Sequence, residues 1–537
     1  MQQRPEAMES RSERDWQRAR GFFEQGNVDA AKAVCETMLG RDADNPSAHW
    51  LLSTIDLGRG NFRSAVLHAQ RTATRAGSLP IHQATATCQA LISVGEYRSA
   101  HSLLLALDAE AANGLALVAI AEQLILLEDY ASALHRIDVA TRRGMRHPIL
   151  SFLRSNALKF SGRRQDAIDA LEDTLSLEPN HAHAHWSLAD LGTPDDAGRR
   201  IDRIRRAMPR AVAPTPGVDS LSDSEHRAVL GYALFKEFDA LGDTGAAWQA
   251  LEAAMALKKG LVDYQPEVED AIFDRLIDTY SPEFMTAAES IPAVHVPVFI
   301  VGMPRTGTTV LERIIGNHSQ VSSGGELNEM QMQVKWATDH YCPDFVDTTV
   351  ASRLASVDAG ALAQGYLAAT AWRAAGRPWL TDKHQSNFLF CGMILRSMPQ
   401  ARIVHMRRDP MDSCFSNLKE LFSPHMYSYS YALGDVAHHY GNYSRLMRHV
   451  AAAAPGRILE LRYEDLARDP AAEARRVLQF CGLPDEGDLS DITRNSRPVS
   501  SASSVQVRDS IHANNIGGWK RYAGHLGPLQ ALLNSSD

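Results

Sequence analysis

A glycine-rich turn in the second half of the chain has residue types suited to binding an anion. Gly302 and Gly307 bracket the turn, Arg305 lies between them, and two hydroxyl residues, Thr308 and Thr309, follow directly. An apolar, β-branched run precedes the turn, and an amphipathic helical pattern follows it. In a strand–turn–helix of this kind the backbone N–H groups and the helix N-terminus face an anion. The pattern therefore predicts a phosphate-binding loop.

The residue at position 308 limits the chemistry of this loop. Nucleotide triphosphatases have a lysine there that reaches the β- and γ-phosphates, and the hydroxyl residue after it holds Mg²⁺. This chain has Thr308 instead, and its cation, Arg305, lies inside the loop. A guanidinium fork suits a single phosphate or the group attached to it. We expect a loop that binds one terminal phosphate group without a metal ion, with a Mg²⁺-dependent phosphotransferase as the rival interpretation.

A second buried strand followed by a helix is predicted further along the chain. The run Arg402–Met406 predicts a strand, and Pro410 is suited to the start of the helix that follows. Ser416 falls on the second turn of that helix, so its side chain can face the strand end beside Arg408. Adjacent arginines are usually a solvated surface pair, and we interpret Arg407 as part of the scaffold.

These motifs resemble those of sulfotransferases that use 3′-phosphoadenosine 5′-phosphosulfate (PAPS). The segment PRTGTT at residues 304–309 resembles the 5′-phosphosulfate loop of that family, and the resemblance continues from His295 to about Leu526. Together with the repeats described below, the chain looks like the tetratricopeptide-repeat sulfotransferases, whose catalytic domain is similar to tyrosylprotein sulfotransferase. The resemblance implies an α/β, P-loop-like domain with a central parallel sheet, PAPS as sulfuryl donor, and no metal.

The resemblance also implies which residues bind PAPS. They are Arg305, Thr306, Gly307, Thr308 and Thr309 in the loop, Arg408 and Ser416 at the 3′-phosphate, Tyr463 near the adenine ring, and Arg508 and Lys520 near the C-terminus. Arg521 is a further candidate for closing over the 3′-phosphate. A basic residue that the tyrosylprotein enzymes use after the serine falls near Glu420 here, and Lys419 is its substitute.

The catalytic residues are likewise implied by the resemblance. Glu326, which follows two glycines, matches the proposed base, and Glu329 is its competitor. Lys383 follows a short apolar strand and matches a lysine at the bridging oxygen of PAPS, where charge develops during transfer. Its neighbour His384 is a rival base. Ser503, with Ser504 as the alternative, matches a serine at the leaving group.

The first half of the chain is a repeat array. A turn pair followed by a fixed alanine recurs, with the alanines at Ala31, Ala65, Ala100, Ala133 and Ala167, in steps of 34, 35, 33 and 34 residues. Each unit predicts two amphipathic helices around a tight turn, in which glycine relieves the steric cost and alanine permits close packing. This period resembles the tetratricopeptide repeat. A sixth pair, with Gly242 and Ala247, follows a proline-rich stretch.

The predicted organisation has four parts. Residues 1–207 form an all-α tetratricopeptide solenoid, 208–223 a linker, 224–290 a helical joint with the sixth pair, and 291–537 the sulfotransferase domain. We expect transfer to a tyrosine of a protein or peptide held partly by the repeats. A carbohydrate or small-molecule O-sulfotransferase is the alternative, followed by a repeat-based adaptor with an inactive domain.

The composition narrows the partners and the compartment. A formal net charge of -9 argues against binding that depends on coating nucleic acid or an anionic membrane. The six cysteines contain no CxxC pair, so reduced thiols are expected rather than a zinc site or disulfides. The first twenty residues lack an apolar core, and no membrane-length apolar run occurs. We expect a cytoplasmic protein with no nucleic-acid or membrane partner. Formation of a homodimer is left open.

Overall fold

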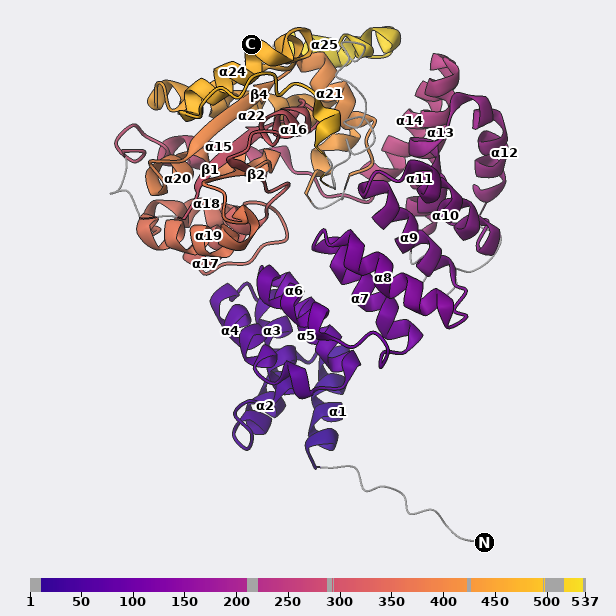
Figure 1. Ribbon diagram of the computed structural model, residues 1–537, viewed down its shortest axis with the longest axis vertical. Helices are drawn as coiled ribbons and strands as arrows, with labels where there is room; N and C mark the ends of the chain where they lie inside the picture. The colour runs from indigo at the N-terminus through magenta and orange to yellow at the C-terminus, as the bar shows by residue number, and fades with distance from the viewer. Residues whose placement is uncertain are drawn as a thin grey trace. The chain divides into compact units, whose positions relative to one another are not determined.

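The computed structural model describes residues 11–209, 221–286, 292, 294–422, 426–495, 497 and 516–534. The chain divides into two compact units (Figure 1). The first holds the chain up to Met145 together with Lys335–Cys342, and the second holds Arg146–Val334 and Pro343–Asp537. Each unit is described separately below.

The first unit is built from antiparallel helix pairs. Its described pairs are α1 (Arg11–Glu24) with α2 (Val28–Leu39), α3 (Pro46–Gly58) with α4 (Phe62–Ala73), α5 (Ile81–Ser93) with α6 (Tyr97–Ala106), and α7 (Gly114–Leu126) with α8 (Tyr130–Arg142). The predicted helix pairs are thereby confirmed in this part of the chain.

The turns between paired helices share one backbone conformation. Gly26, Gly60 and Gly95 have φ values of 76°, 78° and 85°, and Glu128 takes the same position with φ 63°. Glycine adopts this left-handed conformation without steric cost, whereas Glu128 adopts it at a steric cost because it has a Cβ. The repeated alanines that follow the turns are fully buried, which lets the paired helices pack closely. Sequence period and local geometry therefore agree.

A segment from the second half of the sequence packs on the α3–α4 turn of the first unit. Tyr341 N–H donates to the carbonyl of Gly60 at 3.0 Å. The Arg63 guanidinium donates to the carbonyls of Trp336 and Ala337, both at 2.8 Å. These carbonyls belong to the last turn of α17 (Glu329–Thr338), where a cation satisfies otherwise unpaired backbone oxygens.

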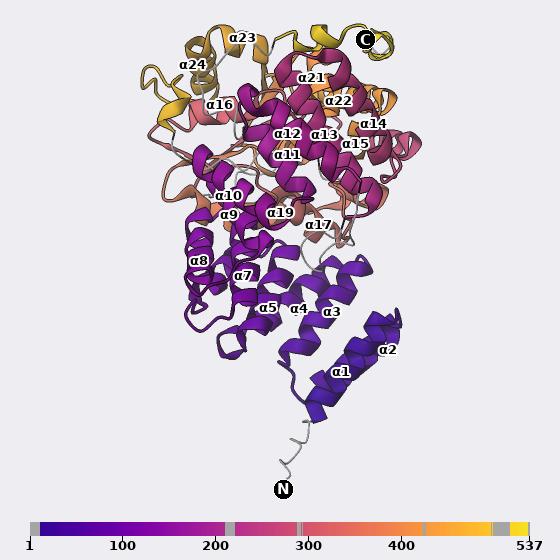
Figure 2. The same cartoon turned by 90° about the vertical axis from the view of Figure 1, so that its right-hand side faces the viewer.

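The second unit begins with further helices of the same kind. They are α9 (Pro148–Phe160) with α10 (Arg164–Leu177), α11 (Ala182–Leu191) with α12 (Ala197–Ala207), α13 (Asp223–Leu241) with α14 (Thr244–Lys259), and then α15 (Pro266–Thr279). Figure 2 shows α9 to α14 in succession. The expected sixth pair is α13–α14, in which Gly242 has φ 78° and Ala247 is fully buried.

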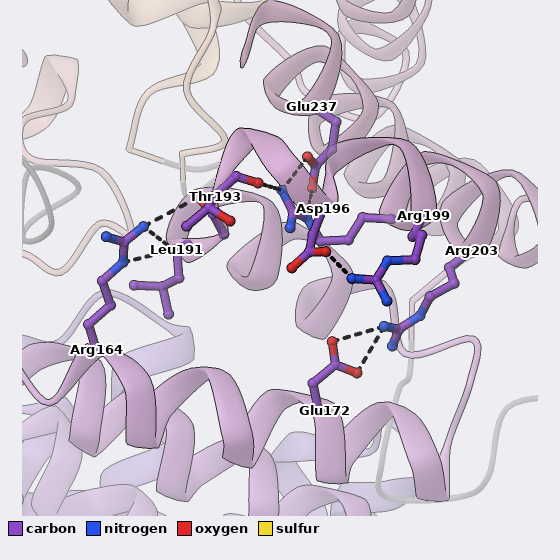
Figure 3. Close-up of polar contacts among 10 residues, drawn as sticks. Arg164, Glu172, Leu191, Thr193, Asp196, Arg199, Arg203 and Glu237 are labelled. Carbon is purple, nitrogen blue, oxygen red and sulfur yellow. Dashed lines mark hydrogen bonds and ion pairs between the residues drawn. The ribbon is translucent and has the colours of Figure 1, made fainter. Parts of the chain in front are cut away.

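Polar contacts join these helices across their ends (Figure 3). Arg164 donates to the carbonyl of Leu191, and Arg203 pairs with Glu172 at 2.8 Å. Arg200 donates through Nε and Nη2 to the two carboxylate oxygens of Glu237, at 2.5 and 2.8 Å. The last pair is buried, so it fixes how α12 meets α13.

A five-stranded parallel sheet forms the centre of the second unit. Its strands are β1 (Val296–Gly302), β2 (Val321–Ser323), β3 (Trp379–Asp382), β4 (Arg402–Arg407) and β5 (Ile458–Arg462). They lie in the order β2-β3-β1-β4-β5, and every pairing is parallel. The expected central parallel sheet is confirmed, and β2 is a three-residue strand that the sequence pattern did not indicate.

Helices cover both faces of the sheet, which is the arrangement expected for buried parallel strands (Figure 1). On one face, Ile300 and Val404 pack with α16 (Thr308–Ile315), α23 (Tyr463–Arg468) and α24 (Pro470–Cys481). On the other, Phe299 contacts Tyr366 of α19 (Ala359–Ala374), and His405 contacts Tyr443 of α22 (Leu433–Ala453). The remaining described α-helices of this unit are α18 (Thr348–Arg353), α20 (Cys391–Ser397), α21 (Pro410–Leu418) and α25 (Gly527–Asn534).

Candidate active site

The phosphate-binding loop connects β1 to α16 and leaves no space for side chains at its two glycines. A Cβ on Gly302 would lie 2.4 Å from the Met406 carbonyl oxygen of β4. A Cβ on Gly307 would lie 2.4 Å from Cδ2 of Tyr463, and Gly307 has φ 96°. Both positions therefore require glycine, because the loop backbone lies directly against its neighbours.

Hydrogen bonds from other elements fix the loop from outside. Asn417 Nδ2 donates to the Pro304 carbonyl at 3.0 Å, and Arg408 Nη1 donates to the Arg305 carbonyl at 3.0 Å. Thr306 Oγ1 donates to the carbonyl of Met303 at 2.8 Å, within the loop itself. The Thr306 hydroxyl thus holds the loop, so its expected contribution to cofactor binding would come from its backbone N–H.

Two residues that were predicted to bind the cofactor lie in the first turn of α16. Thr308 and Thr309 are both buried, directly after Gly307. Their N–H groups belong to the start of the helix, where backbone donors lack partners within the helix. This end of α16 carries the positive end of the helix dipole, which favours an anion.

Three cations surround the loop. Burial lowers the pKa of Arg408, and the charge of Arg305 lowers it further. Burial also lowers the pKa of Lys419 to about 8; the Asp239 carboxylate opposes that shift, and the charges of Arg305 and Arg408 add to it. Like charges held together in this way repel one another and favour an anionic ligand. Lys419 was only a substitute in the sequence interpretation, and the structure places it with this cluster.

Tyr463 contacts both the loop and the second anion-binding position. Its ring packs against Gly307, and the Arg408 guanidinium lies 4.9 Å from the ring centroid. Such a cation–π contact holds the guanidinium in place. Ser416 is buried on α21, the helix that begins directly after Arg408 and Asp409. Arg407 instead pairs with Glu460 of β5 at 2.8 Å, as expected for a scaffold residue.

The predicted base and the predicted leaving-group lysine are in direct contact. Lys383 Nζ donates to Glu326 Oε1 at 2.6 Å. The Lys383 side chain is only 3% exposed, whereas that of Glu326 is 27% exposed. Burial acts to raise the pKa of Glu326, but the charge of Lys383 and its hydrogen bond outweigh burial and hold the pKa below its usual value. Glu326 is therefore ionised at neutral pH.

The backbone before Glu326 is fixed by the two predicted glycines and by a carboxylate that the sequence interpretation missed. A Cβ on Gly324 would lie 2.2 Å from the Thr381 carbonyl oxygen, and Gly325 has φ 80°. Glu312 Oε1 accepts from Gly325 N–H at 2.9 Å and from Thr381 Oγ1 at 2.7 Å. In the sequence, Glu312 stands beside Arg313 in a helix that is half polar, so no signal separates it from a surface residue.

The two rival bases differ from Glu326 in their surroundings. Glu329 is buried, and its Oε1 accepts from Arg373 Nε at 3.1 Å, so it has a structural ion pair. His384 is buried against the ring of Phe345, with ring centroids 5.3 Å apart. Burial lowers the pKa of His384 to about 4, so its ring is neutral at pH 7.

The predicted C-terminal contacts are only partly described. Ser503, Ser504 and Arg508 lie outside the described residues. Asp412 of α21 accepts from Gly517 N–H at 2.6 Å and from Trp519 N–H at 3.3 Å. This holds the start of the last described segment against α21, and the next residue, Lys520, is exposed. Arg521 pairs with Asp239 at 3.1 Å. Asp412 was not singled out in the sequence.

No group of three or more His, Cys, Asp or Glu side chains within the described ranges is arranged to hold a metal ion. Among the helices that the structure describes, none combines the length and apolarity needed to cross a membrane.

Comparison with known proteins locates a family in the second half of the chain. Residues 297–487 match the sulfotransferase family model. The sulfotransferase resemblance is thereby confirmed for this segment, which we call the family segment. It contains the loop, Glu326, Lys383, Arg408 and Tyr463.

Individual proteins are also similar to the chain. An uncharacterized Aquifex aeolicus protein is 29% identical over 320 residues, which cover 57% of this chain and 41% of that protein. A Caenorhabditis briggsae protein named "Putative protein-tyrosine sulfotransferase" is 23% identical over 242 residues, covering 41% of this chain and 80% of that protein. The chain thus spans less than half the length of the first relative.

Solved structures are similar at low sequence identity. The sulfotransferase domain of the Synechococcus PCC 7002 olefin synthase is 16% identical, covering 44% of this chain and 91% of that chain, with a TM-score of 0.32. A tetratricopeptide repeat protein from Parabacteroides merdae is 17% identical, covering 46% of this chain and 93% of that chain, with a TM-score of 0.34.

Proposed function

We propose that this chain transfers the sulfuryl group of PAPS to the hydroxyl of a tyrosine in a peptide or protein. The contact between Glu326 and Lys383, 2.6 Å long and within the family segment, is the observation that carries the proposal. It pairs a carboxylate suited to accept a proton with a buried cation suited to stabilise a leaving group. The tyrosine acceptor is supported by similarity to the Caenorhabditis briggsae protein that is named as a protein-tyrosine sulfotransferase.

The cations around the loop fit a nucleotide with phosphate groups at both ends of its ribose. Arg305 and the start of α16 would hold the 5′ side, and Arg408 with Ser416 the 3′-phosphate. Lys419 adds a further charge beside Arg305 and Arg408. PAPS supplies a sulfuryl group that is already activated by its bond to a phosphate. The chain's own residues then need only orient the reactants and manage charge.

Glu326 would serve as the proton acceptor. Because its pKa is held below the usual value, the carboxylate is ionised before the acceptor binds. The acceptor oxygen forms a bond to sulfur while the bond from sulfur to the phosphate oxygen breaks. The hydroxyl proton goes to Glu326, and the phosphate keeps the electron pair of the broken bond.

Lys383 would stabilise the charge that develops on that phosphate oxygen. A buried ammonium stabilises charge more strongly than a solvated one, because little water screens it. The strand end that carries Lys383 is fixed by its N–H, which donates to the Gly325 carbonyl at 2.9 Å. The hydrogen bond between Lys383 and Gly325 therefore positions both the base and the cation. Loss of Glu326 or of Lys383 should impair transfer.

Cytoplasmic location and a peptide held by the helix pairs complete the proposal. All six cysteines lie within the described residues, and none of them forms a disulfide. Reduced thiols are the usual state of cysteine in the cytosol. Peptide binding by paired helices is supported by the concave surfaces that repeat arrays provide.

Isothermal titration calorimetry with PAP, the desulfated product of PAPS, tests the donor site. We expect PAP to bind in buffer that contains EDTA, and Arg408→Ala to weaken binding by about tenfold or more, since a charge-assisted hydrogen bond contributes about 1.5–3 kcal/mol. The matched control is Arg407→Ala, which removes the neighbouring scaffold arginine. Tight binding of Mg·ATP with no affinity for PAP would falsify the proposal.

A further inference from the structure

The helix pair α13–α14 packs against the last described part of the chain, residues 516–534, which we call the C-terminal segment. The family segment contains neither of them. Tyr522 joins the two, because its side chain is buried and its hydroxyl donates to Asp239 Oδ1 at 2.5 Å. The Tyr522 ring contacts Phe235 of α13 and Trp248 of α14, with ring centroids 6.1 and 6.3 Å apart. The helix pair therefore encloses a side chain that follows the family segment.

Asp239 binds a second residue of the C-terminal segment. Arg521 Nη1 lies 3.1 Å from Asp239 Oδ1, and Arg521 Nη2 donates to the Asp239 carbonyl at 3.2 Å. That carbonyl belongs to the last turn of α13, where the negative end of the helix dipole favours a cation. One residue of α13 thus holds two consecutive residues, Arg521 and Tyr522.

A second carboxylate holds the beginning of the same segment beside the donor site. Asp412 accepts from the N–H groups of Gly517 and Trp519, and its Oδ2 lies 3.8 Å from Arg408 Nη2. Lys520 lies between the two anchors, and its side chain folds back over Gly517. A Cβ on Gly517 would lie 3.6 Å from Lys520 Nζ. The ammonium therefore lies at the end of the segment that is anchored beside Arg408.

Asp239 also acts on Lys419 of the donor site. The Lys419 ammonium lies 5.3 Å from the centroid of the Phe415 ring, and that ring contacts Tyr522 with centroids 4.9 Å apart. Burial lowers the pKa of Lys419, and the charge of Asp239 acts against that shift. Cations that lower the same pKa come from the loop, from the end of β4 and from α13: Arg305, Arg408 and Lys236.

Other charges near this cluster offset one another. Lys236 Nζ lies 2.7 Å from Asp190 Oδ1 and 3.9 Å from Glu420 Oε1, so both of these carboxylates contact a cation. Arg521 offsets part of the Asp239 charge, but its side chain is 49% exposed and water screens that pair. The net effect of Asp239 is to raise the pKa of Lys419.

We propose that Asp239 is a positioning residue for the donor site, through which the α13–α14 pair places Lys520 and Lys419 beside the phosphate groups of PAPS. The inference rests on the proposed function and names a residue outside the family segment. Asp239 would act through the two lysines. It would anchor the segment that carries Lys520, and its carboxylate would keep the Lys419 ammonium charged among other cations. Donor binding would then depend on helices that precede the family segment.

The pH dependence of PAP affinity tests the effect on Lys419. Calorimetry with wild type and Asp239→Asn covers the range from about pH 7 to about pH 9.5, above the second pKa of a phosphate group. The amide keeps the shape of the side chain and still accepts from Tyr522, but it has no charge. We expect the affinity of the variant to fall with a midpoint about 0.5 pH units lower or more, since losing an opposite charge lowers the pKa of an ammonium. Near neutral pH the variant should bind PAP about threefold more weakly.

Two further variants control for other causes. Asp243→Asn makes the same change at the exposed N-cap of α14, where asparagine caps as well as aspartate, and it should leave the midpoint unchanged. In a Lys419→Arg background the charge persists over this range, so Asp239→Asn should move no midpoint there. A general folding defect would weaken binding equally at every pH. An unmoved midpoint in Asp239→Asn, or an equal movement in Asp243→Asn, would overturn the proposal.

A double-mutant cycle tests the anchoring of Lys520. Tyr522→Phe removes the hydroxyl that bonds to Asp239 and keeps the ring among its aromatic neighbours. We expect Tyr522→Phe to weaken PAP binding about threefold in the wild-type background and to have no effect in Lys520→Ala, because residues that act through one another are not additive. Equal effects in the two backgrounds would contradict the role assigned to the C-terminal segment.

The same titrations separate failure of this inference from failure of the proposed function. If wild type does not bind PAP, the proposed function fails. If wild type binds PAP and Arg408→Ala weakens that binding, while Asp239→Asn leaves the midpoint in place, the positioning role of Asp239 alone fails.

Discussion

Two cation–carboxylate pairs in the second unit have similar chemistry and opposite surroundings. Between α12 and α13, Arg200 and Glu237 are 8% and 1% exposed and share two hydrogen bonds. The second pair, Lys383 and Glu326, lies just after the neighbouring strands β3 and β2. Lys383 is as deeply buried as Arg200 and Glu237, but Glu326 is partly open to solvent. One pair is enclosed on all sides, and the other has an accessible carboxylate.

The difference shows how the same ion pair can hold a fold or carry out chemistry. Burial raises the pKa of Glu237 despite the two bonds from Arg200, as happens when desolvation exceeds the Coulomb gain. For Glu326 the balance is reversed, and the pKa is lowered. Glu326 also follows two glycines that bring it to an open edge. Substitutions should therefore separate the pairs, one affecting stability and the other affecting turnover.

The largest expected effect is on turnover by the open pair. Glu326→Gln removes the proton acceptor but keeps the size of the side chain, and we expect kcat to fall by about 10²–10⁴-fold. Single-turnover transfer of labelled sulfate measures the chemical step directly. Urea denaturation of the same variant should show a smaller loss of stability than removal of the enclosed pair, because the amide oxygen of the new side chain still accepts from Lys383 Nζ.

Glu329→Gln is the matched control for that prediction. Glu329 is buried against Arg373, so its loss should lower stability and leave the chemical step nearly unchanged. A fall in kcat for Glu329→Gln as large as that for Glu326→Gln would contradict the assignment of the base.

The enclosed pair should give the opposite result. Arg200→Ala leaves Glu237 buried without its cation, and we expect the free energy of unfolding to fall by about 3–5 kcal/mol. Arg203→Ala removes a partly exposed pair with Glu172 (Figure 3) and should cost less than about 1 kcal/mol. Urea denaturation measures both variants. Equal losses would show that enclosure does not separate the two kinds of pair.

A smaller effect is expected at Lys419, whose charge depends on pH. Its pKa of about 8 means that the ammonium is lost as the pH rises through that value. Affinity for PAP should therefore fall by up to about tenfold from pH 7.5 to pH 9. Calorimetry at both pH values measures the change, and Lys419→Arg should abolish it because guanidinium stays charged. A wild-type affinity that is constant over this range would place Lys419 outside the donor site.

The smallest expected effect is the fall in kcat at low pH, when Glu326 becomes protonated. Because the folded-state pKa of Glu326 lies below 4.5, its stabilising charge is fully present above that value and is lost as the pH falls through the lower pKa. We expect kcat to be flat from pH 8 to about pH 5. A rate that falls with a midpoint above about pH 5 would show that a group other than Glu326 controls turnover.

The helix pairs could be predicted because their determinants are local. A left-handed turn residue and a buried alanine recur at fixed spacing, and both can be seen in the sequence. Spacing located the turn at Glu128 as well, although that residue holds the turn conformation without being glycine. The strands β1 and β4 were equally clear, because buried parallel strands are continuous apolar runs.

The site was predicted in its residue types but not in its supporting contacts. The loop follows from its strand–glycine–helix pattern, and Glu326 and Lys383 were named from the family resemblance, but the direct contact between them was not predicted. Glu312 and Asp412 act through atoms of residues far away in the sequence, Gly325 and Gly517, so their roles depend on the folded arrangement.

Transfer of labelled sulfate from PAPS to a tyrosine-containing peptide, in EDTA, tests the central claim most directly. The wild-type chain should label the tyrosine hydroxyl and release PAP in equal amount, and Glu326→Gln should bind PAP normally while labelling at least a hundredfold more slowly, at the low end of the range of about 10²–10⁴-fold. No label on any acceptor with PAP bound normally, or an unchanged rate in Glu326→Gln, would contradict the account.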